Sequence, residues 1–225
     1  MRAYKLKMTL RGSNPKITRT IAIPENASFR DLHAVIQVVM EWYDYHLHVF
    51  TVGGMEIGDP EEEFEDEMAI PLSEYEGMKI LYNYDFGDDW EIEITWLKAI
   101  EDYEKTTPTL LKWTENSPPE DSGGIFGYNQ LLKDASDPDS EDHEDALEWL
   151  DGNDFNEDYA KEMLDLMHVR GAIDDDEIML PYEARIAIIS ALSVFTDEPL
   201  VFDLDDMMPR IVKDSFPKEI EEEGP

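Results

Sequence analysis

The stretch MKILYNYDFGDDWEIEITWL, residues 78–97, decides the fold, because apolar and polar residues alternate on both sides of a central turn. Successive side chains of a β-strand point to opposite faces, so this alternation predicts two strands that each bury one face. Gly87 and Asp88 stand between the two runs and predict a hairpin turn. The buried face is predicted to carry Ile80, Tyr82 and Tyr84 before the turn and Trp90, Ile92, Ile94 and Trp96 after it.

A second hairpin is predicted at the N-terminus. Residues 4–11 alternate between apolar and mostly basic side chains, GSNP turns the chain, and residues 17–23 alternate again until Pro24 ends the run. A helix is then predicted after Ser28, a good N-cap, because apolar residues follow at helical spacing: Leu32, Val35, Ile36, Val39 and Met40. We expect this helix to pack on the sheet.

The segment HLHVFTVGG, residues 46–54, predicts one more strand, whereas the acidic run at residues 59–67 predicts a mobile loop because it has too few apolar residues to pack. The resulting order is strand, strand, helix, strand, strand, strand. This order predicts an α+β fold in which one helix crosses a curved sheet, somewhat like a β-grasp arrangement. A C-terminal helical section is predicted to follow, with helices at residues 128–135, 141–150 and 157–168.

The composition of the 225-residue chain predicts a folded, cytoplasmic protein. Hydrophobic residues make up 42% of the chain, which is enough for a core, and no apolar run approaches the roughly 20 residues of a membrane helix. There is no cysteine, so disulfides, thiolate metal sites and thiol nucleophiles are excluded. We therefore expect no membrane association.

The net charge of -36 disfavours nucleic acid as a partner, because such a chain repels phosphate on average. The exception is the predicted first strand, whose outer face carries Lys5, Lys7 and Arg11. This face could contact nucleic acid, or it could face acidic residues of the same chain or of a second subunit. We favour an intramolecular contact or a solvated face over nucleic acid, since no aromatic residues are interleaved with the bases.

Four motifs carry a family resemblance: EWYDYHLHVF, YDFGDDWEIEI, SPPEDSGGIFGYNQLL and DPDSEDHEDALEWL. In this order and spacing they resemble the family named after the third open reading frame of an agrobacterial Ri plasmid, whose members are often labelled as passenger proteins of insertion elements. The resemblance covers residues 1–170, which we predict to be one α+β domain. It implies no established activity. Residues 171–225 are predicted to be an acidic extension with one apolar helix at 181–195.

Three positions depart from the family pattern. Many members have cysteines on both sides of PPED and a histidine after the WE pair, a set that could bind a metal. Here these positions are Ser117, Ser122 and Ile92. We therefore do not expect a metal site built on them in this chain.

The loop SPPEDSGGIFGY, residues 117–128, is predicted to be a rigid connector. Its prolines favour an extended conformation, and Gly123 and Gly124 supply positive backbone φ angles or a close chain approach. Phe126 and Tyr128 are expected to anchor its end in the core.

A divalent metal site is the chemistry that the sequence suggests most directly. His46 and His48 are two residues apart on a predicted strand and so point to one face. Carboxylates from two turns could join them, and the candidate ligands are His46, His48, Asp85, Asp88, Glu120 and Asp121. The simpler alternative is that a histidine packs under the helix while the acids only cap their turns, and we favour it.

Two functions remain open at this point. The first is a non-catalytic accessory or interaction module, linked by family to mobile elements, for which a protein partner is expected. The second is a metal-assisted hydrolase that uses the six candidate ligands. We favour the first because no complete set of nucleophile, base and stabilising group can be assembled from the motifs. The sequence leaves the oligomeric state open.

Overall fold

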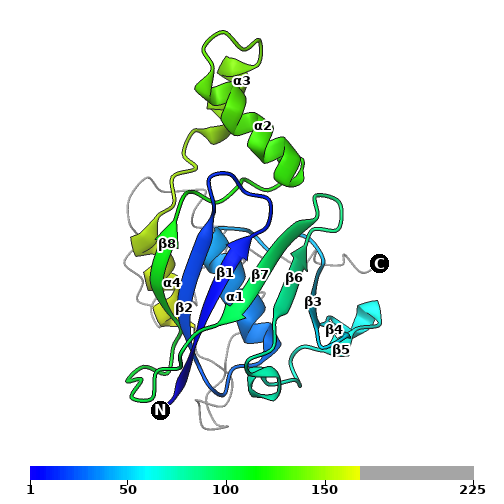
Figure 1. Ribbon diagram of the computed structural model, residues 1–225, viewed down its shortest axis with the longest axis vertical. Helices are drawn as coiled ribbons and strands as arrows, with labels where there is room; N and C mark the ends of the chain where they lie inside the picture. The colour runs from blue at the N-terminus through cyan, green and yellow to red at the C-terminus, as the bar shows by residue number, and fades with distance from the viewer. Residues whose placement is uncertain (168–225) are drawn as a thin grey trace, which may run out of the picture. The chain divides into compact units, whose positions relative to one another are not determined.

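The computed structural model in Figure 1 describes residues 1–167. The eight strands of this part of the chain form one sheet in the order β5-β4-β3-β6-β7-β1-β2-β8. The strands are β1 (Ala3–Leu10), β2 (Thr18–Pro24), β3 (His48–Val52), β4 (Met55–Gly58), β5 (Glu65–Asp66), β6 (Ile80–Tyr84), β7 (Trp90–Trp96) and β8 (Thr109–Thr114). All neighbouring strands pair antiparallel except β4 and β5. The helices are α1 (Phe29–Met40), α2 (Gly124–Ser136), α3 (His143–Leu150) and α4 (Glu157–Leu166), with short 3-10 turns η1 (Pro60–Glu62) and η2 (Leu72–Tyr75).

The two predicted hairpins are confirmed and lie side by side in the sheet. β1 pairs with β2 on one side and with β7 on the other, so that Leu6 faces Ile21 and Trp96. In the second hairpin Tyr82 faces Ile92. The α+β class and the C-terminal helical section are confirmed. The predicted strands and helix follow one another as expected, but β4, β5 and β8 are additional to the predicted order.

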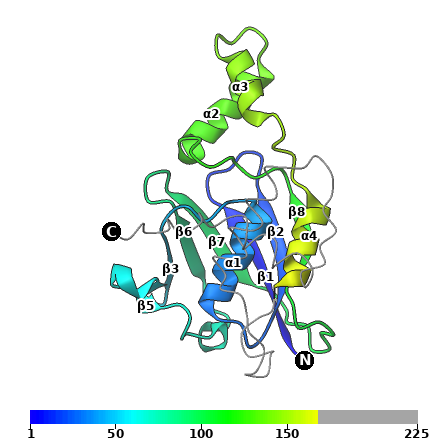
Figure 2. The same cartoon turned by 180° about the vertical axis from the view of Figure 1, so that it is seen from behind.

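Helix α1 crosses one face of the sheet, which Figure 2 shows from the helix side. Ser28 begins it as predicted: its hydroxyl accepts a hydrogen bond from the Asp31 N–H, and the Asp31 carboxylate accepts one from the Ser28 N–H. Such a capping box satisfies backbone donors that the first turn leaves open. The core lies between α1 and the inward-facing side chains of β1, β3, β6 and β7.

Three parts of the fold differ from the sequence predictions. Strand β4 follows β3, where no strand is predicted. Strand β8 is not predicted, because two adjacent leucines interrupt the alternation of apolar and polar residues in its sequence. In the structure Leu110 is buried and Leu111 is exposed. The acidic run at residues 59–67 contains η1 and β5, and its last residue, Glu67, is buried. The prediction that this run is only a mobile loop is therefore wrong at its C-terminal end, where a buried carboxylate is hydrogen-bonded.

Arg19 is fully buried on the inner face of β2. Its Nε donates to the Val39 carbonyl at 2.7 Å, and its Nη1 donates to the Thr114 carbonyl at 2.8 Å. The Ser117 hydroxyl accepts from Nη2 at 2.7 Å, and the Phe155 ring lies 4.2 Å from the guanidinium carbon. Burial lowers the pKa of Arg19 to about 10. One side chain thus joins β2, α1, β8 and the chain on both sides of α2 and α3.

Side-chain hydrogen bonds close the segment that carries α2 and α3 at its base. The Asn116 side chain donates to the Asp154 carboxylate at 3.0 Å and accepts from the Phe155 N–H at 3.1 Å. The Asn153 amide donates to the Ser117 carbonyl at 2.7 Å. We call these contacts the neck. Beyond it, α4 packs against β8 and α1.

None of the helices among residues 1–167 is long and apolar enough to cross a membrane. The predicted domain boundary at residue 170 and the predicted apolar helix at 181–195 lie outside the described residues.

Candidate functional site

Three loops converge beside the end of β6, and we call this region the three-loop site. The first loop is residues 42–47, before β3; the second is the turn at residues 85–89, between β6 and β7; the third is residues 118–124, before α2. The Trp42 indole donates to the Pro118 carbonyl at 3.1 Å, and the Asp88 carboxylate accepts from the Gly123 N–H at 3.1 Å. Each loop comes from a different one of the four sequence motifs.

His46, Asp85 and Asp121 come together at this site, one from each loop. The His46 Nε2 atom lies 3.6 Å from the Asp85 Oδ2 atom and 3.6 Å from the Asp121 Oδ1 atom. One potential ligand atom from each of the three side chains lies within 4.8 Å of the other two. Asp85 is largely buried, His46 is partly exposed, and Asp121 is open to solvent.

Local backbone conformation fixes the Asp85 carboxylate. Asp85 has a φ of 56°, and its N–H donates to the Leu47 carbonyl at 2.9 Å, which ties the second loop to the first. The Asp85 Oδ1 atom accepts from the Gly87 N–H at 2.9 Å. Since Oδ1 caps the turn, Oδ2 is the oxygen left to face His46.

Glu120 and Asp88, also predicted as ligands, hold the loops together instead. The Glu120 Oε1 atom accepts from the Tyr84 hydroxyl, and Oε2 accepts from the Tyr43 N–H at 3.1 Å. Burial raises the pKa of Glu120, and burial together with the Glu120 carboxylate raises the pKa of Tyr84. The contact is therefore a phenol that donates to a carboxylate.

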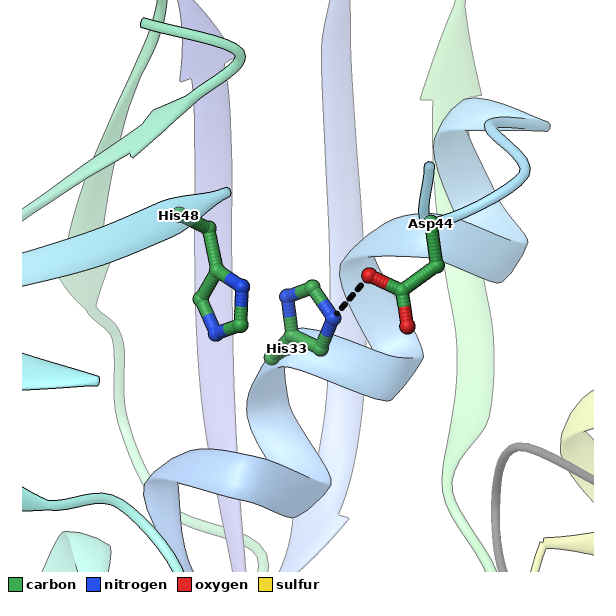
Figure 3. Close-up of side chains that lie close together, drawn as sticks. All are labelled: His33, Asp44 and His48. Atoms are coloured by element: carbon green, nitrogen blue, oxygen red, sulfur yellow. Dashed lines mark hydrogen bonds and ion pairs between the residues drawn. The ribbon is translucent and has the colours of Figure 1, made fainter. Parts of the chain in front are cut away.

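His48 belongs to a second group, shown in Figure 3 with His33 and Asp44. The rings of His33 and His48 stack at a centroid distance of 3.5 Å and an interplanar angle of 11°. The His33 Nε2 atom is hydrogen-bonded to Asp44 at 2.8 Å, and the His48 Nε2 atom is hydrogen-bonded to Glu67 at 2.7 Å. The structure therefore does not bring His48 to the three-loop site.

The hydrogen bonds of this group assign the tautomer of His33. The Gln37 amide donates to the Tyr82 hydroxyl at 2.9 Å, so the hydroxyl hydrogen is left for the His33 Nδ1 atom, which lies 2.9 Å away. The His33 Nε2–H then donates to the Asp44 carboxylate. Lone pairs lie in the ring plane, so two stacked, nearly parallel imidazoles do not converge on one metal ion. This group is a buried hydrogen-bond network.

Burial and hydrogen bonds together set the pKa values of the side chains in this network. Burial, reinforced by the neighbouring His48, lowers the pKa of His33 to about 4. Burial alone would raise the pKa of Glu67, but the His48 hydrogen bond and the nearby His33 and Arg30 lower it to about 2. At neutral pH the network is thus a neutral His33 beside ionised carboxylates.

Sequence reasoning missed His33, Asp44 and Glu67. A signal for His33 was present, because His33 and Gln37 are four residues apart within the apolar helix and so share its buried face. Polar residues at that spacing on a core-facing stripe need partners. Nothing comparable marked Glu67 in the acidic run.

The three positions that depart from the family pattern have structural contacts here. Ser117 is buried against Arg19, and the Ser122 hydroxyl donates to the Pro119 carbonyl at 2.7 Å. Ile92 is fully buried in β7. In α2 Tyr128 is buried as predicted, but Phe126 is 87% exposed, so the prediction that Phe126 anchors in the core is wrong.

The basic outer face of β1 has an acidic counterpart on the neighbouring strand. Arg11, directly after β1, forms an ion pair with Glu91 of β7 at 2.9 Å. This contact is intramolecular.

Comparisons with known proteins identify relatives whose function is not known. The chain is 31% identical over 160 residues to the uncharacterized protein y4hQ of Sinorhizobium fredii, an alignment that covers 68% of this chain and 82% of that protein. It also resembles a crystal structure of a protein of unknown function from Methanosarcina mazei Go1. The TM-score is 0.62 and the identity 39%, over 69% of this chain and 92% of that one. A model of the plasmid pRiA4b ORF-3-like proteins matches residues 2–167. The chain therefore belongs to the plasmid pRiA4b ORF-3-like protein family.

Proposed function

We propose that this chain is a non-catalytic accessory module that binds a protein partner at the three-loop site. The observation that carries the proposal is a group of exposed apolar side chains around that site. Their exposed fractions are 47% for Tyr43, 71% for Tyr45, 46% for Leu47 and 49% for Phe86. Large apolar residues that gather on a surface mark interaction sites, and tyrosine and other aromatic residues are enriched in interfaces.

Rigid positioning of these side chains supports an interface. The Tyr43 N–H is held by Glu120, and the Tyr45 N–H donates to the Tyr84 hydroxyl at 3.1 Å. The rings of Tyr43 and Tyr45 stack at a centroid distance of 5.8 Å. Preorganised aromatic side chains lose little conformational entropy when a partner binds.

Charge complementarity defines the chemistry of the partner. The carboxylates of Asp85, Asp88 and Asp121 belong to the same three loops as the exposed apolar side chains, and the whole chain has a net charge of -36. Lysine and arginine side chains complement carboxylates and also bind aromatic faces. We infer a partner segment that presents basic and apolar side chains together.

The roles of the other predicted ligands weigh against the hydrolase alternative. Glu120 binds Tyr84 and Tyr43, Asp88 binds the Gly123 N–H, and His48 binds Glu67. A hydrolase would need one of these groups free as a base or acid near the reacting atoms. An interaction module needs them where they are, as supports of the loops.

Site-specific photo-crosslinking tests the partner proposal. A photoreactive phenylalanine analogue replaces Tyr45 in one variant and Leu111, on the edge strand β8, in a matched control, and each is illuminated in an extract of the source organism. We expect a discrete adduct at Tyr45 that is absent at Leu111 and weakens with added salt, because the charged contacts are screened. The same adduct at both positions, or none at Tyr45, would exclude this surface as the interface.

A further inference from the structure

We propose that His46, Asp85 and Asp121 bind one divalent transition-metal ion of the zinc class. This metal site goes beyond the partner proposal and does not depend on it, because the isolated chain is expected to bind the ion.

The spacing of the three side chains fits a metal better than hydrogen bonds. Both distances from the His46 Nε2 atom, 3.6 Å to Asp85 and 3.6 Å to Asp121, exceed the usual N–H···O range of roughly 2.7–3.2 Å. With metal–ligand bonds of about 2.1 Å, neighbouring ligand atoms of a tetrahedral zinc site lie roughly 3.4 Å apart. The two observed separations are therefore close to the edges of such a tetrahedron.

The number of carboxylates near the nitrogen also favours a shared ion. An imidazole nitrogen offers one hydrogen or one lone pair, yet the His46 Nε2 atom faces two carboxylates. A cation bound to the nitrogen lone pair could also bind both carboxylates. Two carboxylates and a neutral imidazole carry a charge of -2, which one divalent ion neutralises.

The ligand set selects the class of metal. A nitrogen ligand disfavours Mg²⁺ and Ca²⁺, which prefer oxygen ligands alone, and the absence of cysteine removes the softest thiolate sites. Imidazole with carboxylates suits Zn²⁺ and its neighbours. Asp121 is 76% exposed, which leaves room for water at the fourth position.

The surrounding contacts preorganise the three ligands. Gly87 holds the Asp85 carboxylate, and the edge of the His46 ring packs against Tyr84 at 5.8 Å and 74°. The contact between Asp88 and the Gly123 N–H fixes the loop that carries Asp121. Partners of this kind orient metal ligands and raise affinity.

Titration of the purified, chelator-treated full chain with Co²⁺ tests the site, because four-coordinate Co²⁺ absorbs visible light far more strongly than the hydrated ion. We expect one tightly bound equivalent with an intense spectrum, displaced by Zn²⁺ and retained in excess Mg²⁺. His46→Gln and Asp121→Asn should each weaken binding by about a hundredfold or more, since even second-shell changes cost about 10–100-fold.

The controls separate this site from general attraction to an acidic chain. His143→Gln removes a histidine that lies in another acidic region, on α3, and should leave binding and spectrum unchanged. Circular dichroism checks that each variant folds. If Asp121→Asn does not fold, Asp85→Asn replaces it in the test, because asparagine tolerates positive φ. Equal affinity in wild type and His46→Gln, or loss of binding in excess Mg²⁺, would overturn the proposal.

Discussion

The buried imidazole of His33 makes the stability of the chain sensitive to acid. In the unfolded chain His33 takes up a proton below its ordinary pKa of 6.5, whereas in the folded chain it stays neutral down to about pH 4. Protons therefore bind preferentially to the unfolded state within this window. The stability associated with neutral His33 is fully present above pH 6.5 and is lost as the pH falls to 4.

The size of this effect follows from the two pKa values. The two pKa values differ by about 2.5 (6.5 minus about 4), and a difference of one is worth about 1.4 kcal/mol. The full contribution is therefore about 3.5 kcal/mol, of which about 3 kcal/mol is lost by pH 4. The side chain is fully buried, and solvent screening does not reduce the figure. A loss of this size is a large fraction of the stability of an ordinary domain.

Urea denaturation at a series of pH values between 7 and 4 measures it, with the fluorescence of the buried Trp42 and Trp90 as the signal. The free energy of unfolding of the wild type is compared with that of His33→Gln, which cannot titrate there, and with that of the control His143→Gln. We expect the gap between wild type and His33→Gln to shrink by about 3 kcal/mol across the window. Parallel curves for the wild type and His33→Gln would contradict a lowered pKa of His33 in the folded chain. If His143→Gln altered the pH dependence equally, His33 would not be the cause of the loss of stability in acid.

Three further variants test the packing, each by urea denaturation at pH 7. Tyr82→Phe removes the hydroxyl shared by a buried imidazole and a buried amide of α1 and should destabilise by about 2–4 kcal/mol; a change below the measurement error would mean that water replaces it. Arg19→Lys should cost more than about 2 kcal/mol, because one ammonium cannot reach the acceptors on three separate segments, and full stability would contradict that. Gly124→Ala places a Cβ 2.2 Å from the Asp88 carbonyl oxygen and should cost several times the roughly 1 kcal/mol of Gly77→Ala, where φ is also positive but the space is open. Equal losses in the two glycine variants would show that the loop yields without strain.

Three adjacent strands in the middle of the sheet could be predicted from the sequence because apolar and polar residues alternate along them. β1, β6 and β7 each bury every second residue, so local pattern and final structure agree. β8 could not be found, because it is an edge strand, where fewer side chains reach the core and the alternation fades.

Arg19 illustrates what a pattern indicates and what it does not. Arg19 has the same parity in β2 as Ile21 and Ile23, so the alternation places it on the inner face, where it lies. Three of its four acceptors, however, come from segments distant in sequence. The same is true of the candidate site. His46, Asp85 and Asp121 could be named as residues of the right chemistry, but only the pairing of β3 with β6 and the approach of the third loop select these three from six.

The neck lets this fold accept additional residues near α3. Asn116 and Asn153 fasten both ends of the helical segment to each other, so residues added near α3, the far end of the segment, would leave these two ends together. Doubling the length of a flexible segment between fixed ends costs only about 0.6 kcal/mol. The end of this segment around α3 is therefore a natural place to accept an inserted peptide or a reporter domain, while the three-loop site and the core keep their geometry.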